Sequence, residues 1–254
     1  MINCYWGGYF KSPHTLDKTP DGVDYVTLAF SNPTIESKLS TAFLCSQYPD
    51  EEIIKWVKLL QSKGTKVLMS IIDSPSVHWD EIDIPKFSIS LNEIIFDKWG
   101  LDGIDIDAES DMENDYCKNF ISLVENIKKV IPENKLITYT CYEGTDLYDG
   151  KILSEIKDKI NWINLMAYFD DFDEMISLFK DYNKIIDEKN IMIGVKAGAD
   201  NDFSRTSIDE VAKLCKWNPD KKGMMLWTLN RDCNLFTGKT EWLWLNTIKE
   251  NLKN

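Results

Sequence analysis

Short apolar stretches rich in β-branched and aromatic residues recur along the chain, and most are followed by a turn signal and a segment with helical periodicity. Most of these stretches are apolar at nearly every position, which is typical of parallel strands buried on both faces. We expect eight strands, at Ile2–Trp6, Tyr25–Phe30, Lys66–Ile71, Gly103–Asp107, Lys135–Cys141, Trp162–Tyr168, Ile191–Lys196 and Gly223–Thr228.

The segments between these strands carry apolar residues at helical spacing. In the clearest case Asp50 can cap a helix whose apolar face includes Ile53, Val57 and Leu60, and Gly64 can end it. Similar faces occur at Phe87–Ile95, Phe120–Ile127, Ile152–Ile156, Met175–Ile186, Ile208–Leu214 and Trp242–Leu252, but not between the first two strands. Regular alternation of strands and helices predicts a parallel sheet, and eight units favour a closed (β/α)₈ TIM barrel over an open doubly wound sheet.

The length of 254 residues suits one such barrel, which needs about 250 residues. The chain has no linker, low-complexity tract or shift in composition, so we expect residues 1–254 to form a single domain without an inserted α+β domain. No apolar run approaches the roughly 20 residues that a transmembrane helix needs.

The net charge of −13 disfavours nucleic acid and anionic membranes as partners, because both attract an excess of Lys and Arg. The six cysteines are scattered without a CxxC pair, and no charged-then-apolar leader opens the chain. These features indicate either a cytoplasmic protein or a trimmed secreted one. We expect a monomer.

The most distinctive segment carries three acids, Asp105, Asp107 and Glu109, at alternate positions. Alternate side chains leave the same face of a strand, so these acids would form one line with about 6 to 7 Å between neighbours. Crowded carboxyl groups cannot all ionise cheaply, so we expect at least one proton to be held within the group at neutral pH. The line ends where a barrel strand ends, which is where barrel enzymes place their active sites.

The same segment resembles the DxxDxDxE signature of glycoside hydrolase family 18, and reads Asp102-Gly103-Ile104-Asp105-Ile106-Asp107-Ala108-Glu109. That family includes chitinases, endo-β-N-acetylglucosaminidases and inactive lectin-like relatives. The resemblance implies a carbohydrate substrate that contains N-acetylglucosamine, and no metal or other cofactor.

Three other strand ends resemble the substrate-binding positions of this family. Tyr168 matches a tyrosine that binds the acetamido group, and Met166 matches the residue two positions before it. Trp227 matches a tryptophan that forms the floor of the cleft, and Tyr5 matches a position on the cleft wall of plant-type members.

The chain departs from the family pattern at two places. Phe169 stands where many chitinases have an Asp after the tyrosine, and Ser70-Ile71-Ile72-Asp73 stands in place of Ser-X-Gly-Gly. These departures predict a differently shaped cleft. The short connections resemble those of plant-type chitinases and single-domain endo-β-N-acetylglucosaminidases.

The family resemblance implies a substrate-assisted reaction. Glu109 would protonate the glycosidic oxygen, Asp107 would orient the acetamido group while sharing a proton with Asp105, and Tyr168 would hold the acetamido oxygen. The acetamido oxygen would attack the anomeric carbon to give an oxazolinium ion. Asp102 has the wrong parity to join the line and is expected to brace the strand from the barrel interior.

Other chemistries have less support. His14 and His78 are the only histidines and stand alone, which disfavours a Ser-His-Asp triad or a His-rich metal site. The acidic run 109–115 is either a solvated loop or, as a weaker alternative, a calcium ligand set. Three hypotheses remain open: a chitinase, an endo-β-N-acetylglucosaminidase and a sugar-binding relative without catalysis.

Overall fold

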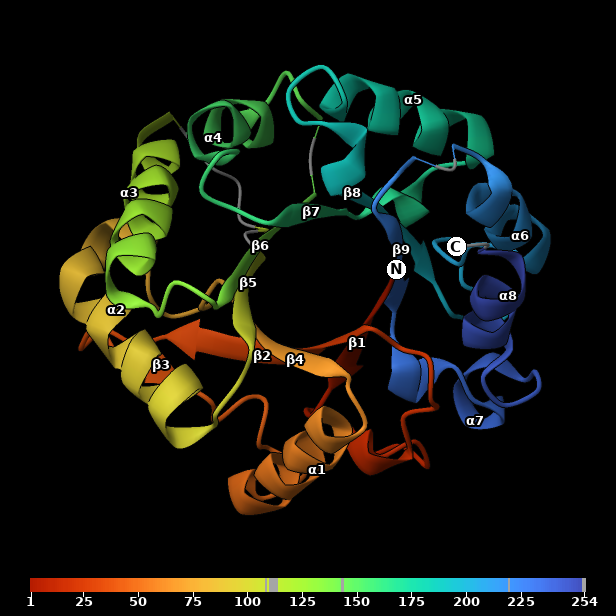
Figure 1. The fold of residues 1–254 in the computed structure, drawn as a ribbon, viewed down its shortest axis with the longest axis horizontal. Coiled ribbons are helices and arrows are strands. Elements are labelled where there is room, and N and C mark those ends of the chain that lie inside the picture. The colour runs from red at the N-terminus through yellow and green to blue at the C-terminus, as the bar shows by residue number, and fades with distance from the viewer. Residues whose placement is uncertain (108, 110–113, 143, 219, 253–254) are drawn as a thin grey trace.

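The computed structural model of the chain is a closed ring of strands surrounded by helices (Figure 1). It describes the chain except for residues 108, 110–113, 143, 219 and 253–254, and of residues 114–117 it describes the backbone alone. Nine strands form the sheet, and all except the short β3 run parallel in one barrel. The expected TIM barrel is therefore confirmed, with no inserted domain among the described residues.

The strands are β1 (Ile2–Gly7), β2 (Tyr25–Pro33), β3 (Leu39–Ser40), β4 (Lys66–Ile72), β5 (Gly103–Asp107), β6 (Leu136–Cys141), β7 (Trp162–Leu165), β8 (Ile191–Lys196) and β9 (Gly223–Trp227). The helices are α1 (Asp50–Ser62), α2 (Ile84–Asn92), α3 (Asn114–Val130), α4 (Tyr148–Ile156), α5 (Phe172–Tyr182), α6 (Ile208–Lys216), α7 (Asn234–Thr237) and α8 (Leu243–Asn251).

Pairing of the first and last strands closes the barrel. Ile2 of β1 lies opposite Met224 of β9, while the other edge of β1 pairs with β2 from Asn3 to Gly7. The β1–β2 connection contains only a short 3₁₀ turn (Leu16–Lys18) and no α-helix, in agreement with its lack of helical periodicity.

The helices bury the faces that their apolar spacing predicts. In α1 the buried residues are Ile53, Val57 and Leu60, which lie on one face at i, i+4 and i+7. Gly64 follows the helix with a φ of +92°, a left-handed conformation that glycine adopts without a steric penalty. This turn directs the chain into β4.

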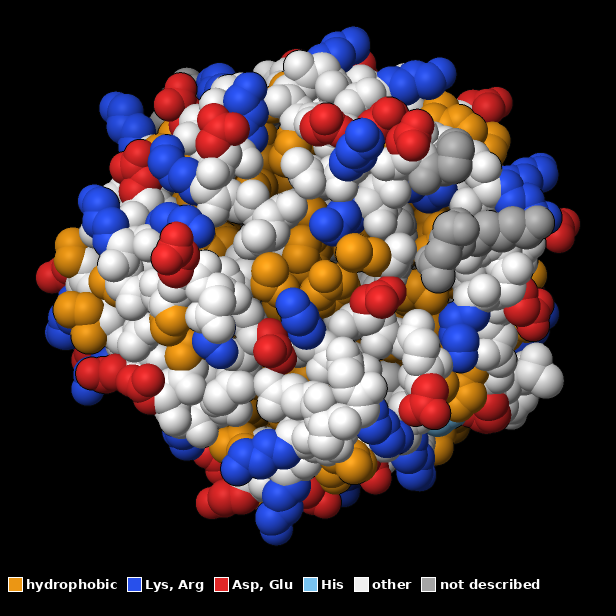
Figure 2. All heavy atoms as spheres, viewed as in Figure 1, with side chains coloured by type: hydrophobic (Ala, Val, Ile, Leu, Met, Phe, Trp, Pro, Cys, Tyr) orange, Lys and Arg blue, Asp and Glu red, His pale blue; other side chains and the backbone are white. Residues whose placement is uncertain are grey.

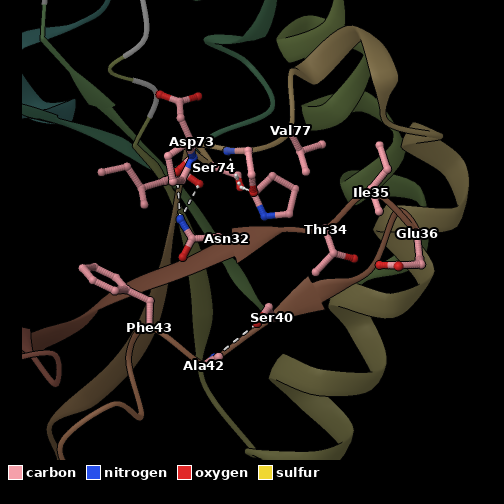
Figure 3. A pocket seen from close by; sticks show the side chains of 14 residues that line it. Asn32, Thr34, Ile35, Glu36, Ser40, Ala42, Phe43, Asp73, Ser74 and Val77 are labelled. Atoms are coloured by element: carbon pink, nitrogen blue, oxygen red, sulfur yellow. Dashed lines mark hydrogen bonds between the residues drawn. The ribbon is translucent and has the colours of Figure 1, made fainter.

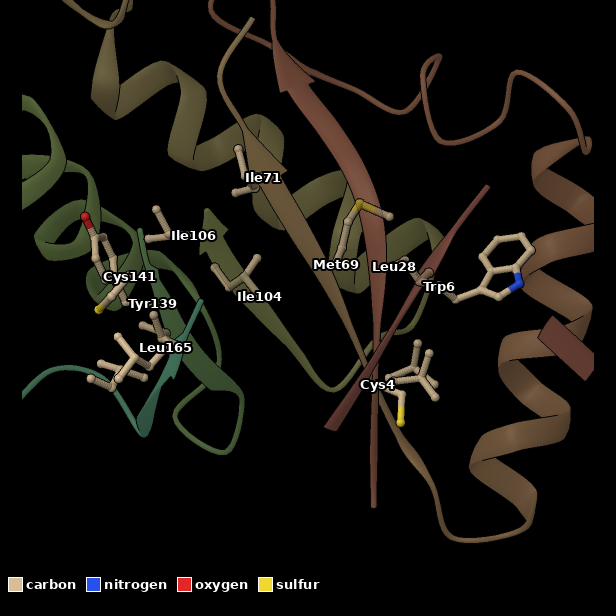
Figure 4. Close-up of a cluster of buried hydrophobic side chains, with 14 of the residues drawn as sticks. Cys4, Trp6, Leu28, Met69, Ile71, Ile104, Ile106, Tyr139, Cys141 and Leu165 are labelled. Atoms are coloured by element: carbon tan, nitrogen blue, oxygen red, sulfur yellow. The ribbon is translucent and has the colours of Figure 1, made fainter. Parts of the chain in front are cut away.

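Alternation along each strand divides the core into two layers. Outward-facing residues such as Ile104 and Ile106 of β5 belong to a large apolar cluster under the helices (Figure 4). Inward-facing residues form a smaller cluster that includes Tyr5, Tyr168 and Trp227. At the end that carries the N-terminus, hydrophobic side chains close the centre of the barrel (Figure 2), so the interior is packed.

The main difference from the expected strands lies in β7. The apolar run Trp162–Tyr168 suggested one strand, but β7 ends at Leu165 and a 3₁₀ turn covers Ala167–Phe169. The run stays buried through Tyr168 because it turns over the barrel mouth. Among the described residues, no helix is long and apolar enough to cross a bilayer.

Candidate active site

Asp105 is the centre of a hydrogen-bond network inside the barrel. Its side chain is fully buried and lies beside Ser70 of β4 and Thr138 of β6, which are its register partners. Hydroxyl and amide groups from four other strands donate to its carboxylate. The donors are Tyr5 Oη (2.7 Å), Ser70 Oγ (2.7 Å), Thr138 Oγ1 (2.5 Å), Thr140 Oγ1 (3.1 Å) and Asn164 Nδ2 (3.2 Å). Because protein donors occupy both of its carboxylate oxygens, Asp105 is a structural anchor that holds the inward-facing side chains of these strands together.

Asp107 lies on the same inward face of β5, next toward the barrel mouth, and is 2% exposed. Its Oδ1 atom is buried and has no hydrogen-bond partner among the described residues. Burial raises the pKa of Asp107 well above its usual range, and the charges of Glu109 and Asp105 raise it further. Asp107 is therefore the carboxyl group that favours the proton expected within the acidic group.

Glu109 follows β5 at the mouth of the barrel and is exposed. Its backbone N–H donates to Asp73 Oδ2 at 2.8 Å, which ties the end of β5 to the loop after β4. Partial desolvation raises the pKa of Glu109, and the charge of Asp73 adds to this. A carboxyl group with a raised pKa can keep its proton close to neutral pH and give it to a leaving group.

Tyr168 and Trp227 lie in the same inward-facing cluster, together with Met166. Burial raises the pKa of the Tyr168 hydroxyl, and the charges of Asp107 and then Glu109 raise it further, so this side chain is a neutral phenol. Trp227 ends β9 and is half-buried, with its ring 5.5 Å from that of Phe30. Met166 is 5% exposed and precedes the 3₁₀ turn that carries Tyr168.

Tyr5 faces inward at the middle of β1 and is 1% exposed. Its hydroxyl group points at Asp105 and Thr140, at 2.7 Å from each. Tyr5 therefore supports Asp105, and its expected place on the cleft wall stays a prediction.

Asp102 braces its strand from a different side than expected. Its Oδ2 accepts from the side chain of Gln61 in α1 at 2.8 Å and from the backbone of Val67 in β4 at 2.9 Å. These partners lie outside the barrel interior, because Asp102 precedes β5 and shares the outward parity of Ile104.

Thr138, Thr140 and Asn164 also belong to the site, although no sequence motif marks them. All three face inward on β6 or β7, and the signal that could have found them is the alternation of polar residues in otherwise apolar strands. Asp73 stood out only as a departure from the family pattern.

A cavity of about 810 Å³ opens beside Asp73, between the β2–β3 hairpin and the loop after β4. Figure 3 shows Asn32 and Asp73 close together on its wall, where Asn32 Nδ2 donates to the Asp73 carbonyl oxygen at 2.8 Å. Phe43 also lines the cavity and is 45% exposed. The lining of this cavity is therefore both apolar and polar, and Asp73 connects it to the backbone of Glu109.

Among the residues that the structure describes, one side-chain group has the ligand types of a metal site, namely His14, Cys233 and Glu241. His14 already has partners on both ring nitrogens, with Nε2 at 2.5 Å from Glu241 and Nδ1 at 3.3 Å from the Leu229 carbonyl oxygen. Its ring also stacks on Trp242, so His14 has a structural role. Residues 110–113 of the acidic run lie outside the described residues, so its calcium-binding alternative stays a prediction.

The comparisons with known proteins agree with this geometry. Residues 9–226 match the family model for the endo-β-N-acetylglucosaminidase EndoS TIM-barrel domain. A chitinase of glycoside hydrolase family 18 from Pseudoalteromonas aurantia superposes with a TM-score of 0.78 at 20% identity, over 99% of both chains.

Two further solved structures share the barrel. An endo-β-N-acetylglucosaminidase from Cordyceps militaris has a TM-score of 0.76 at 16% identity, over 100% of this chain and 91% of that chain. The catalytic domain of a family 18 chitinase from the fern Peteris ryukyuensis has a TM-score of 0.77 at 14% identity, over 100% and 99%. With the matching family model and the acids of β5, these findings show that the chain belongs to glycoside hydrolase family 18, in the group of the EndoS TIM-barrel domain.

Proposed function

We propose that the protein is a retaining glycosidase that cleaves β-1,4 bonds at N-acetylglucosamine in chitin or chitooligosaccharides by substrate-assisted catalysis. The observation that carries the proposal is the contrast between Asp105, whose oxygens are filled by protein donors, and Asp107, whose buried Oδ1 is left without one among the described residues. A buried acceptor without a partner costs free energy that a ligand N–H can recover.

In this mechanism Glu109 is the general acid. It protonates the glycosidic oxygen as the bond from that oxygen to the anomeric carbon breaks. The exposure of Glu109 at the barrel mouth and its raised pKa both suit this role. After the leaving sugar departs, the same carboxylate takes a proton from the water that opens the intermediate.

The nucleophile comes from the substrate. Burial and neighbouring charges raise the pKa of Asp107, so this carboxyl group tends to stay neutral and is a poor attacking group. Its unprotonated oxygen can still accept a hydrogen bond from an acetamido N–H. The acetamido oxygen then forms a bond to the anomeric carbon, with Tyr168 as its hydrogen-bond donor. Trp227 would support the apolar face of the sugar in this position.

A second candidate substrate is the chitobiose core of N-glycans. The match over residues 9–226 to the EndoS TIM-barrel model favours it, since that model describes an endo-β-N-acetylglucosaminidase. The cavity beside Asp73 can take further sugar units in either case. A sugar-binding relative without catalysis is the third candidate, and intact Glu109 argues against it.

The test is incubation of the protein with chitooligosaccharides and, separately, with a high-mannose glycoprotein, followed by mass analysis of both. Glu109→Gln keeps the shape of the side chain but cannot supply a proton, so we expect it to abolish hydrolysis and leave folding and sugar binding largely intact. The product anomer, read by NMR at early times, should be retained, and a thiazoline analogue of the oxazolinium ion should inhibit.

Turnover of Glu109→Gln at the wild-type rate would refute the assignment of the acid. Inversion at the anomeric carbon, or equal hydrolysis of plain glucosides, would refute substrate assistance. If wild-type protein binds but cleaves neither substrate, the sugar-binding alternative holds.

A further inference from the structure

Asp73 connects the loop after β4 to the catalytic end of β5. Its Oδ2 atom accepts from the backbone N–H of Glu109 at 2.8 Å, and its Oδ1 atom accepts from the indole N–H of Trp79 at 2.5 Å. Trp79 is 4% exposed, with its ring 4.8 Å from that of Phe120 and 5.8 Å from that of Phe87. Both carboxylate oxygens of Asp73 are therefore held by protein donors, one of which is anchored in the core.

We propose that Asp73 is a positioning residue for Glu109, which fixes the backbone of the acid and places a negative charge beside its side chain. The inference rests on the proposed function, because it assigns Asp73 to the reaction of that same site. An aspartate at this position is a departure from the family pattern, in which glycine offers neither a hydrogen bond from a side chain nor a charge. Such a residue would adapt this chain for proton donation at higher pH.

The charge of Asp73 acts on both acids. It is the second cause, after desolvation, of the raised pKa of Glu109, and it also contributes to the raised pKa of Asp107. A nearby negative charge makes ionisation of a carboxyl group less favourable, so Asp73 helps Glu109 to keep its proton.

The other described groups that interact electrostatically with Glu109 do not supply this charge. Tyr9, from the loop after β1, and Tyr168, from the turn after β7, have pKa values raised mainly by burial and remain neutral phenols. Asp107 of β5 has a raised pKa and tends to hold a proton itself. Among the described residues, Asp73 is therefore the neighbour best placed to act on Glu109 through charge.

The test is the pH profile of kcat/KM for Asp73→Asn. The amide removes the charge but retains one acceptor for a backbone or indole N–H. A general acid must be protonated to work, so a lower pKa of Glu109 should move the alkaline limb of the profile to lower pH. Asp73→Glu keeps the charge at a longer reach, and we expect it to lower the rate while leaving the alkaline limb near its wild-type position.

The matched control is Asp83→Asn, in the same connection between β4 and α2. Asp83 is exposed and caps α2 by accepting from the Lys86 backbone, and no electrostatic effect of Asp83 on Glu109 or Asp107 is found among the described residues. The substitution Asp83→Asn should leave the alkaline limb of the pH profile unchanged. An unmoved limb in Asp73→Asn, or an equal displacement in Asp73→Asn and Asp73→Glu, would overturn the proposal.

A second measurement separates this inference from the proposed function. Carboxyl ¹³C NMR titration of Glu109 in the ligand-free protein needs no turnover, and Asp73→Asn should lower the titration midpoint of Glu109. If that midpoint moves while no substrate is cleaved, the proposed function fails and the inference about Asp73 holds. If the wild type is active but the midpoint stays in place, the inference fails alone.

Discussion

Replacement of Tyr5 by Phe removes one hydroxyl group from the centre of the barrel and little else. The ring of Tyr5 lies 5.5 Å from the ring of Trp227, and phenylalanine keeps that contact. The lost hydroxyl donates to Asp105 and lies at 2.7 Å from Thr140 and 3.3 Å from Asn164. The variant therefore tests the hydrogen bond to a buried carboxylate with almost no change in volume.

The expected cost follows from the number of donors that remain. Asp105 keeps the donors from Ser70, Thr138, Thr140 and Asn164, so the loss is that of one bond to a carboxylate, about 1.5–3 kcal/mol. For a protein of this length each kcal/mol lowers Tm by about 2–4 °C. We expect a decrease of about 2 kcal/mol in the free energy of unfolding, measured by urea denaturation at neutral pH, with an unchanged m-value.

Tyr25→Phe is the matched control, because the Tyr25 hydroxyl forms an exposed contact with the sulfur of Met1, at 3.8 Å, and no other hydrogen bond to the residues that the structure describes. It should change the free energy of unfolding by less than about 0.5 kcal/mol. Equal effects of the two substitutions would show that Asp105 does not depend on Tyr5, and would refute the description of Asp105 as an anchor.

Two further predictions concern stability and binding. Burial raises the pKa of Asp232 to about 6, so its contribution to stability is present below pH 4 and is lost as the pH rises through 6. The difference in the free energy of unfolding between wild type and Asp232→Asn should therefore fall by about 3 kcal/mol between pH 4 and 7. A difference that stays constant with pH in urea denaturation would contradict this. Trp227→Ala in the Glu109→Gln background should weaken the affinity for an N-acetylglucosamine tetramer about tenfold, as measured by calorimetry. The reason is the loss of about 1.5 kcal/mol of apolar contact with the sugar. If the folded fraction binds with unchanged affinity, Trp227 is a packing residue.

Much of the fold could be predicted because the barrel strands are continuous apolar runs that alternate regularly with segments of helical periodicity. All eight expected strands are present, and Gly64 follows its helix with a positive φ, as its position suggested. The end of β7 could not be predicted, since the apolar run through Tyr168 stays buried in a 3₁₀ turn as it would in a strand. Burial pattern alone does not distinguish these two conformations.

The acids of the site were visible in the sequence because they follow strand alternation, but their partners were not. Whether Ser70 and Thr138 reach Asp105 depends on register between strands that lie 33 to 35 residues apart in the sequence. The depth of Tyr5 in the barrel has the same origin, since it depends on the tilt and stagger of β1 against β9. The partners of Asp102 could not be predicted either, since they come from α1 and β4, which are distant in the sequence.

The network around Asp105 also has a consequence for the order of assembly. Its hydrogen bonds join residues that are far apart in the sequence, with separations of 100 residues for Tyr5 to Asp105 and 159 for Asn164 to Tyr5. Such contacts must wait until loop closure has brought several strands together, so they form late in folding. Interactions absent from the transition state act on the unfolding rate. The hydrogen bonds around Asp105 therefore slow the unfolding of the barrel and have little effect on its rate of folding.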